Sequence, residues 1–243
     1  MNSQASSFRA FAISLDGKAT ELAELPATGA SPESAYVWTH LHVQQEGARE
    51  WLLDEAKLDR TVVEAMMAED TRPRALFKDD DVMLIFRAMN LHEGEPPEEM
   101  ISLRIWIDER RVITTRLRDI KAVEEIQASI ASGQSPASPA ELLKSITSRM
   151  FARMEPFLDD LEDSIAAVEE QIASGSELDL CEGMLPMRRQ VAVFRRYVTP
   201  QKTVLQKLHE HPIPCLCSED QQHFGEELDR VTRYVEEIDE LSA

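Results

Sequence analysis

Apolar residues at helical spacing dominate the chain from residue 140 to residue 243, and no β-prone run interrupts them. In the first part of this region they recur at every third or fourth position, which places them on one face of an α-helix. The pattern predicts an uninterrupted helix of about nine turns that ends at Ser174-Gly175-Ser176. The residues of this face are Met150, Met154, Phe157, Leu161, Ile165, Val168 and Ile172.

Two further helices are predicted after this break. The first runs to about Leu208 and is interrupted at Pro186 and Pro200, each of which is expected to start or to kink a segment, because proline removes a backbone donor and its ring clashes with the preceding turn. The second begins near Ser218, a good N-cap residue, and its apolar residues alternate between spacings of four and three. This spacing is typical of a coiled-coil seam. The seam consists of Phe224, Leu228, Val231, Val235 and Ile238.

The N-terminal part of the chain mixes strand and helix signals, so we predict an α+β protein. Strands are expected at residues 8–13, 36–43, 74–77, 82–90, 100–107 and 112–116, and helices at 50–58, 62–67 and 120–130. The unbroken apolar run Ile105-Trp106-Ile107 predicts a strand that is covered on both faces. The loop Gln134–Pro139 separates a first part, residues 1–136, from a helical part, residues 137–243.

The formal net charge is −19, from 26 basic and 45 acidic residues. This charge argues against binding to nucleic acid or to an anionic membrane surface, and it favours cations as partners. The longest apolar run, Val82–Phe86, is too short to cross a bilayer, and no secretory signal is visible. Three cysteines are too few for a disulfide framework, so the chain is expected to be cytosolic and soluble.

Five residues with metal-binding side chains fall between positions 209 and 223: His209, His211, Cys215, Cys217 and His223. Imidazole and thiolate are zinc ligands, and four of these groups could surround one ion. The spacing does not match a known zinc-finger pattern. The alternative is a helix–helix connection whose histidines and cysteines have no common ligand.

The last predicted helix, residues 218–243, carries 9 acidic and 2 basic residues. Its carboxylates could attract divalent cations in an oligomer, or could form a solvated face paired with Arg230 and Arg233. The acidic residues are Glu226, Glu227, Asp229, Glu236, Glu237, Asp239 and Glu240.

Two weaker candidates have simpler interpretations. Asp79-Asp80-Asp81 resembles a chelating triplet, but between two strands it is interpreted as a turn. His40 and His42 share one strand face but have no evident third ligand. No pair of carboxylates with separated environments is apparent, so neither catalytic residues nor an organic cofactor are expected.

Several segments, in order along the chain, resemble the zinc-transporter (ZntB-type) branch of the CorA family of divalent-cation channels. The segments in the first part are Thr71-Arg72-Pro73-Arg74, Leu84–Leu91, Glu99–Ile107 and Val112–Arg116. Those in the helical part are Arg188-Arg189, Phe194–Gln201, Asp229-Arg230, Arg233 and Glu237–Asp239.

This resemblance implies an α/β/α layered domain with a mixed sheet, followed by a long helical hairpin and a stalk helix. Family members assemble as pentamers that form a funnel, and they continue into two transmembrane helices with a Gly-Met-Asn signature. Because this sequence has neither, we interpret it as a truncated form without the pore. Magnesium members bind a regulatory cation between subunits, but the matching positions here are Ala65 and Glu226, so half of that site is missing.

We therefore predict the funnel domain of a divalent-cation transporter, with Zn²⁺ or another divalent cation and further copies of the chain as its partners. Its expected location is the cytoplasmic face of the inner membrane, which it would reach only through the missing C-terminal segment. The alternative is a free-standing cytosolic metal-binding or helical scaffold protein. Neither interpretation makes it an enzyme.

Overall fold

A computed structural model describes residues 8–26, 34–173, 180–211 and 213–242. Its strands are β1 (Phe8–Ser14), β2 (Ala19–Leu22), β3 (Ser34–His42), β4 (Arg74–Lys78), β5 (Asp81–Ala88), β6 (Ile101–Ile107) and β7 (Arg111–Arg116). Its helices are α1 (Ala48–Glu50), η1 (Trp51–Glu55), α2 (Arg60–Met67), α3 (Lys121–Ala131), α4 (Pro139–Phe151), α5 (Glu155–Ala173), α6 (Leu180–Glu210) and α7 (Ser218–Leu241). The predicted strands and the three short helices of the first part are confirmed, whereas β2 was not predicted.

The seven strands form one mixed sheet in the order β2-β1-β3-β7-β6-β5-β4. Strands β3 and β7 run parallel, and the other neighbouring strands are antiparallel. The two-residue turn between β4 and β5 is formed by Asp79 and Asp80, as predicted, and Asp79 adopts a positive φ of 50° there. Asp tolerates this left-handed conformation better than most residues.

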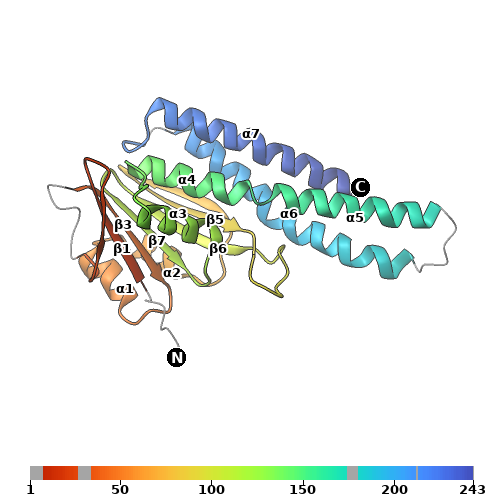
Figure 1. Cartoon of the computed structure of the whole chain (residues 1–243), viewed down its shortest axis with the longest axis horizontal. Helices are drawn as coiled ribbons and strands as arrows, with labels where there is room; N and C mark the ends of the chain where they lie inside the picture. Colours follow the sequence, from red (N-terminus) through yellow and green to blue (C-terminus); the bar gives the residue numbers. More distant parts are fainter. Residues whose placement is uncertain (1–7, 27–33, 174–179, 212, 243) are drawn as a thin grey trace.

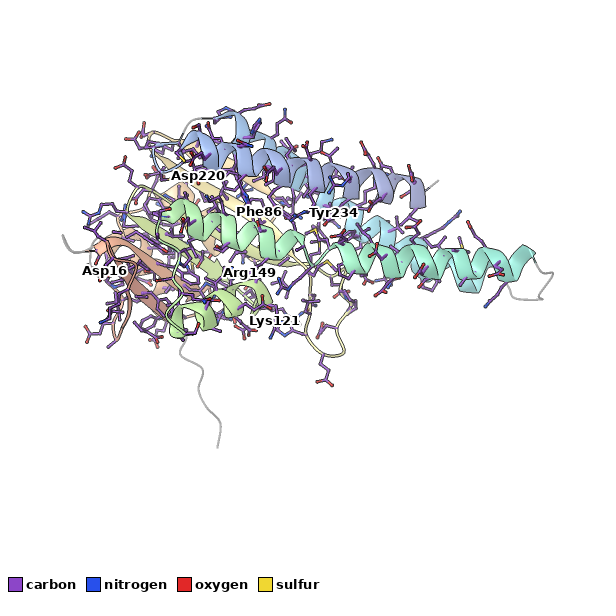
Figure 2. The ribbon with its side chains drawn as sticks, turned by 45° about the horizontal axis from the view of Figure 1, so that its top comes forward. Asp16, Phe86, Lys121, Arg149, Asp220 and Tyr234 are labelled. Atoms are coloured by element: carbon purple, nitrogen blue, oxygen red, sulfur yellow. The ribbon has the colours of Figure 1, made fainter. Side chains whose placement is uncertain are left out.

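Helices cover both faces of the sheet, which confirms the predicted α/β/α layering. One face packs against η1 and α2 through a cluster that includes Leu52, Met66 and Trp106. The other face packs against α3, α4, α6 and α7. Phe86 of β5, labelled in Figure 2, meets Phe151 of α4 edge to face, with 5.8 Å between the ring centroids. The predicted double coverage of β6 follows, because Ile105 and Trp106 belong to opposite clusters.

Beyond the sheet, α5 and α6 extend as a helical hairpin, with α7 lying along them (Figure 1). The prediction of one helix over residues 140–173 is wrong, because the structure ends α4 at Phe151 and begins α5 at Glu155. Pro156 explains the break: it has no N–H for the carbonyl of Ala152, and its ring would clash with that carbonyl in a continuous helix.

The prediction that Pro186 or Pro200 starts a new helical segment is also wrong, whereas a kink at either residue stays a prediction. Helix α6 continues through both Pro186 and Pro200. At its sheet-facing side, Gln201 Oε1 accepts a hydrogen bond of 2.9 Å from the backbone N–H of Arg87, so tertiary contacts hold the segment beside Pro200 against β5.

The loop before α4 has a clear helix-start geometry. Ser138 is the N-cap and accepts from the backbone N–H of Glu141 at 3.1 Å, while the Glu141 carboxylate accepts from Ala137 N–H at 2.8 Å. These contacts satisfy backbone donors that a helix start leaves without intrahelical partners. The division of the chain at residues 136 and 137 stays a prediction. Within the described ranges, no helix combines the length and hydropathy that spanning a bilayer requires.

Candidate functional site

Helix α7 is the element that carries most of the predicted functional residues, and its first turn is fixed by a capping box. The N-cap is Cys217 rather than the predicted Ser218. Its backbone N–H donates to Oδ2 of Asp220 at 3.0 Å, and its thiol donates to the same oxygen at 3.1 Å. The other oxygen, Oδ1, lies 2.6 Å from Nζ of Lys144 on α4.

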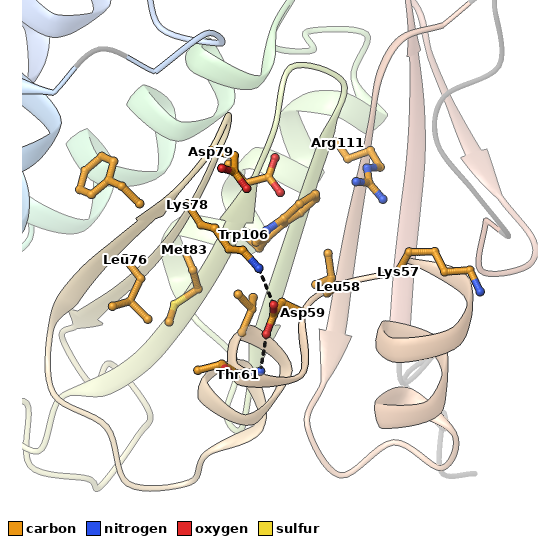
Figure 3. A pocket seen from close by; sticks show the side chains of 13 residues that line it. Lys57, Leu58, Asp59, Thr61, Leu76, Lys78, Asp79, Met83, Trp106 and Arg111 are labelled. Atoms are coloured by element: carbon orange, nitrogen blue, oxygen red, sulfur yellow. Dashed lines mark hydrogen bonds and ion pairs between the residues drawn. The ribbon is translucent and has the colours of Figure 1, made fainter.

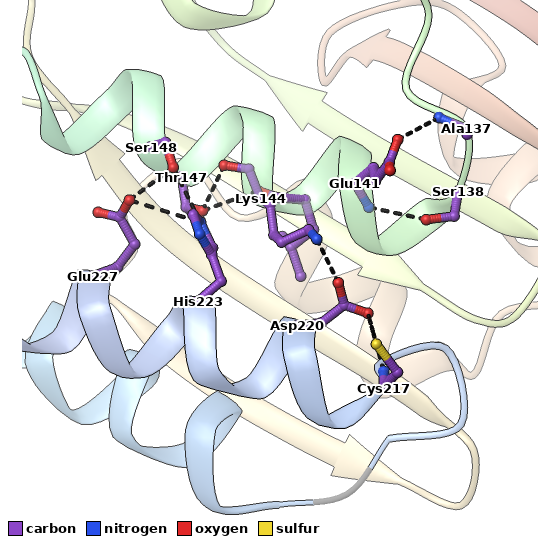
Figure 4. A network of polar contacts seen from close by, with 11 residues as sticks. Ala137, Ser138, Glu141, Lys144, Thr147, Ser148, Cys217, Asp220, His223 and Glu227 are labelled. Carbon is purple, nitrogen blue, oxygen red and sulfur yellow. Dashed lines mark hydrogen bonds and ion pairs between the residues drawn. The ribbon is translucent and has the colours of Figure 1, made fainter. Parts of the chain in front are cut away.

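The carboxyl of Asp220 is therefore held from two sides. Burial acts to raise its pKa, but the hydrogen bonds from Lys144 and from Cys217 outweigh burial, so the pKa lies below its ordinary value. The pKa of Lys144 is raised, chiefly by the hydrogen bond to Asp220. Both pKa shifts favour the charged forms of Asp220 and Lys144. The ion pair between these side chains attaches the start of α7 to α4 (Figure 4).

A second polar contact between α4 and α7 lies two turns further along. Oγ of Ser148 donates to Oε1 of Glu227 at 2.7 Å and lies 3.1 Å from Nε2 of His223. Arg230 donates to both oxygens of the same carboxylate, at 3.2 and 3.0 Å (Figure 4 shows the Ser148, His223 and Glu227 side). Glu227 is only 3% exposed, so this carboxylate is buried and fully partnered.

This arrangement corrects the prediction for Glu227, which is not available to a cation on the surface of α7. Asp239 is exposed but forms an ion pair of 2.9 Å with Arg195 of α6. The remaining predicted carboxylates are exposed: Glu226, Asp229, Glu236, Glu237 and Glu240. The solvent side of α7 is thus acidic, and its inner side carries Phe224, Val231 and Ile238 of the predicted seam.

Asp220 and Glu227 could have been recognised as inward-facing from the sequence. They fall on the same alternating repeat of four and three as Phe224 and Val231. Their partners could not have been recognised, because Lys144 and Ser148 lie more than 70 residues away in the chain. No local pattern links two such positions.

The His and Cys residues before and within α7 are not brought together. Nδ1 of His209 contacts the carbonyl of Gln221 at 2.9 Å, and His211 stacks on Phe77 with ring centroids 4.9 Å apart. Burial raises the pKa of the Cys215 thiol to about 12, which disfavours the thiolate that zinc needs. Cys217 and His223 are engaged with Asp220 and Ser148 as described above. Among the described residues, no three His, Cys, Asp or Glu side chains are placed to hold one metal ion.

His40 and His42 are likewise held by separate partners. Nδ1 of His40 lies 2.7 Å from Oγ1 of Thr114, and Nε2 of His42 lies 2.8 Å from the carbonyl of Leu117. Burial, together with the charges of Arg116 and Arg9, lowers the pKa of His40 well below its ordinary value. Within the described part of the chain, no third His, Cys, Asp or Glu side chain joins this pair in an arrangement that could hold a metal ion.

A hollow of about 550 Å³ lies at the start of α2, on the sheet face opposite the hairpin (Figure 3). Lys78 contacts Asp59 across it, and the Arg111 guanidinium lies 4.5 Å from the centroid of the Trp106 ring. Arg111 also contacts Asp108 at 2.8 Å. Lys78 and Arg111 are thus already paired with acidic side chains of the chain, so the hollow is a weaker candidate for a ligand site than α7.

A different kind of electrostatic feature lies where α5 and α7 meet. We define the acidic seam as Glu155, Asp159 and Glu162 of α5 with Glu237 of α7. Burial, followed by the charges of Asp159 and Glu162, raises the pKa of Glu237, and Arg233 only partly opposes this effect. Helices α5 and α7 are in contact, and these four exposed carboxylates lie close enough for their charges to repel one another.

Comparisons with known proteins agree with this architecture. The divalent cation transporter CmaX of Pseudomonas aeruginosa is 31% identical over 210 residues, covering 86% of this chain and 63% of that protein. The zinc transport protein ZntB of Pectobacterium carotovorum is 28% identical over 209 residues, covering 83% of this chain and 62% of that protein. This chain thus spans less than two thirds of the length of either relative.

The crystal structure of the ZntB cytoplasmic domain from Vibrio parahaemolyticus shares the fold, with a TM-score of 0.83 at 22% identity. The match covers 96% of this chain and 91% of that one. The family model described as CorA-like Mg2+ transporter protein matches residues 33–243, which include the five strands β3 to β7 and all of the described helices. The chain therefore belongs to the CorA-like Mg2+ transporter protein family.

Proposed function

We propose that this chain is the cytoplasmic domain of a divalent-cation transporter, with zinc as the transported ion, and that it works as an assembly of identical copies at the inner membrane. Family membership supports transport rather than catalysis. The names of the relatives, a divalent cation transporter and zinc transport proteins, support the type of cargo. The fold shared with a ZntB cytoplasmic domain supports the place of this part in the whole protein.

The exposed carboxylates of α7 are the observation that carries this proposal. Glu226, Asp229 and Glu236 lie on its solvent side, and none of them has an ion pair among the described residues. Carboxylates attract divalent cations, and several of them on one helix raise the local cation concentration near the surface. We propose that α7 gathers cations in this way.

The contacts between α7 and α4 suggest how cation occupancy would reach the rest of the domain. Lys144 and Ser148 hold the inner side of α7, while its outer side carries the charges that a cation would neutralise. A cation that binds one packing of α7 more tightly than another shifts the population toward that packing. The His209–His223 cluster has no part in this proposal, because its described side chains have separate partners.

Zinc titration by isothermal calorimetry tests the proposal. We expect the triple variant Glu226→Gln, Asp229→Asn, Glu236→Gln to bind zinc at least about threefold more weakly than the wild type at low salt. The matched control is Asp160→Asn with Asp163→Asn, which removes exposed carboxylates from α5 instead. Equal affinity in the wild type and the α7 variant would contradict the proposal.

A further inference from the structure

Helix α6 carries a groove lined by arginines on its exposed side. Arg188, Arg195 and Arg196 of α6 line it together with Arg72, which precedes β4, and the hollow has a volume of about 960 Å³. Its floor consists of small or short side chains, among them Ala192, Thr199 and Thr203, and the end of α7 contributes Leu241 and Ser242. We call this surface the arginine groove.

Most of the positive charge in this groove has no acidic partner in the described chain. Arg195 pairs with Asp239, but no ion pair is found for Arg72, Arg188 or Arg196 among the described residues. Arg72 and Arg188 are exposed, so they are held in place by neither burial nor a carboxylate. In a chain with a net charge of −19, three such arginines along one groove form a local exception.

The acidic seam shows the opposite imbalance. Its four carboxylates lie on α5 and α7, and their mutual repulsion contributes to the raised pKa of Glu237. No ion pair joins Glu155, Asp159 or Glu162 to a basic side chain among the described residues. The seam thus carries more negative than positive charge, even with Arg233 nearby, whereas the arginine groove carries more positive than negative charge.

The arginine groove lies mainly on α6, with the end of α7 at its edge, and the acidic seam lies on α5 and α7. No ion pair between described residues joins a groove arginine to a seam carboxylate. A second copy of the chain can satisfy both, because charge complementarity favours contact between a positive and a negative patch. We propose that the arginine groove of one copy receives the acidic seam of the next. This contact rests on the proposed function, since it names the surfaces through which the copies assemble.

Such a contact is heterologous, because each copy uses two different surfaces. Repeated contacts of this kind close into a ring when the rotation between copies allows it, and otherwise continue as an open chain. The short side chains on the groove floor suit this role, because Ala192 and Thr199 let another helix approach α6 closely.

One-sided variants test the contact by sedimentation velocity. The groove variant is Arg72→Ala with Arg188→Ala, and the seam variant is Asp159→Asn with Glu237→Gln. Each leaves the other surface intact. We expect each variant alone to associate at least about tenfold more weakly than the wild type. In an equal mixture, the intact seam of the groove variant can still bind the intact groove of the seam variant. We therefore expect heterodimers that share one contact, and no larger assemblies.

The matched controls remove the same charges elsewhere. Arg74→Ala with Arg189→Ala removes two exposed arginines outside the groove, and Asp160→Asn with Asp163→Asn removes two exposed carboxylates of α5 outside the seam. We expect both controls to associate like the wild type. Circular dichroism melting of every variant verifies that it is folded.

Three results would overturn the proposed contact: wild-type association in both one-sided variants, a mixture that behaves as two separate monomers, or a wild type that stays monomeric at every concentration. Zinc titration of the groove variant separates this proposal from the proposed function, because that variant keeps every carboxylate of α7. Retained zinc binding with unchanged association would reject the contact alone. Loss of zinc binding only in the α7 variants would support the proposed function, and weaker association of the one-sided variants in sedimentation velocity would support the contact.

Discussion

Ser148 of α4 donates a hydrogen bond to the buried carboxylate of Glu227 on α7, with 2.7 Å between the two oxygens. The same carboxylate accepts from Arg230 at 3.0 Å, and the His223 ring lies beside it. This carboxylate therefore joins two helices that are far apart in the sequence.

Removing the Glu227 carboxylate should destabilise the fold. In Glu227→Ala, the partly buried Ser148 hydroxyl and the Arg230 guanidinium lose their shared acceptor. We expect the free energy of unfolding to fall by about 1–3 kcal/mol, measured by urea denaturation. Glu226→Ala, one position away and exposed, is the control and should change it by less than about 0.5 kcal/mol. Equal effects of the two substitutions would show that the buried contact contributes nothing.

The lowered pKa of Asp220 predicts a pH-dependent contribution to stability. Because the folded-state pKa lies below the unfolded value, the contribution is present above the unfolded pKa and is lost as the pH falls through the folded pKa. At neutral pH, Asp220→Asn should therefore be less stable than the wild type by about 1–3 kcal/mol. The difference should shrink on acidification. A difference that stays constant in acid would contradict a role for the carboxylate charge.

Glu237 should show the opposite sign. Its folded-state pKa is raised by burial and by Asp159 and Glu162, so ionisation of Glu237 costs stability as the pH rises from the unfolded value through the folded value. We expect Glu237→Gln to raise the Tm slightly at neutral pH, at a protein concentration where the chain is monomeric. The gain should decrease with added salt, since the carboxylates are exposed. Destabilisation by this substitution would rule out net repulsion at the seam.

Gly225 and His209 should be energetically coupled. A Cβ atom at position 225 would lie 3.0 Å from Nδ1 of His209, closer than ordinary van der Waals contact. Alanine in a helix interior is otherwise favoured over glycine by about 1 kcal/mol. We therefore expect Gly225→Ala to stabilise the protein more in a His209→Ala background than in the wild type. A double-mutant cycle measures this coupling, and additive effects would show that the ring moves away without cost.

The sequence predicted the elements whose signal is local. Strand alternation, turn residues and the apolar repeat of α7 each lie within a few positions, and the corresponding elements were predicted. The helix break near Pro156 was missed because the apolar repeat continues from Met150 through Met154 to Phe157, whereas the backbone donor that proline lacks leaves no trace in that repeat. Periodicity reports which side chains are buried and does not report whether every backbone hydrogen bond can form.

Site prediction had a different limit. The exposed carboxylates of α7 could be identified from composition, but the engagement of Glu227 and Asp239 depends on Ser148 and Arg195, which the fold brings in from other helices. The predicted metal cluster is not formed among the described residues. His209 and Cys217 are close in sequence but have different partners in the fold, because His209 contacts the carbonyl of Gln221 and the thiol of Cys217 donates to Asp220.

Asp220 uses its two oxygens for two different tasks. Oδ2 accepts hydrogen bonds from the backbone N–H and the thiol of Cys217, and Oδ1 contacts Nζ of Lys144. Fraying of the first turn of α7 would therefore also release its tether to α4. Protonation of Asp220 would weaken both contacts at once, so the capping of α7 and its attachment to α4 depend on the same carboxylate.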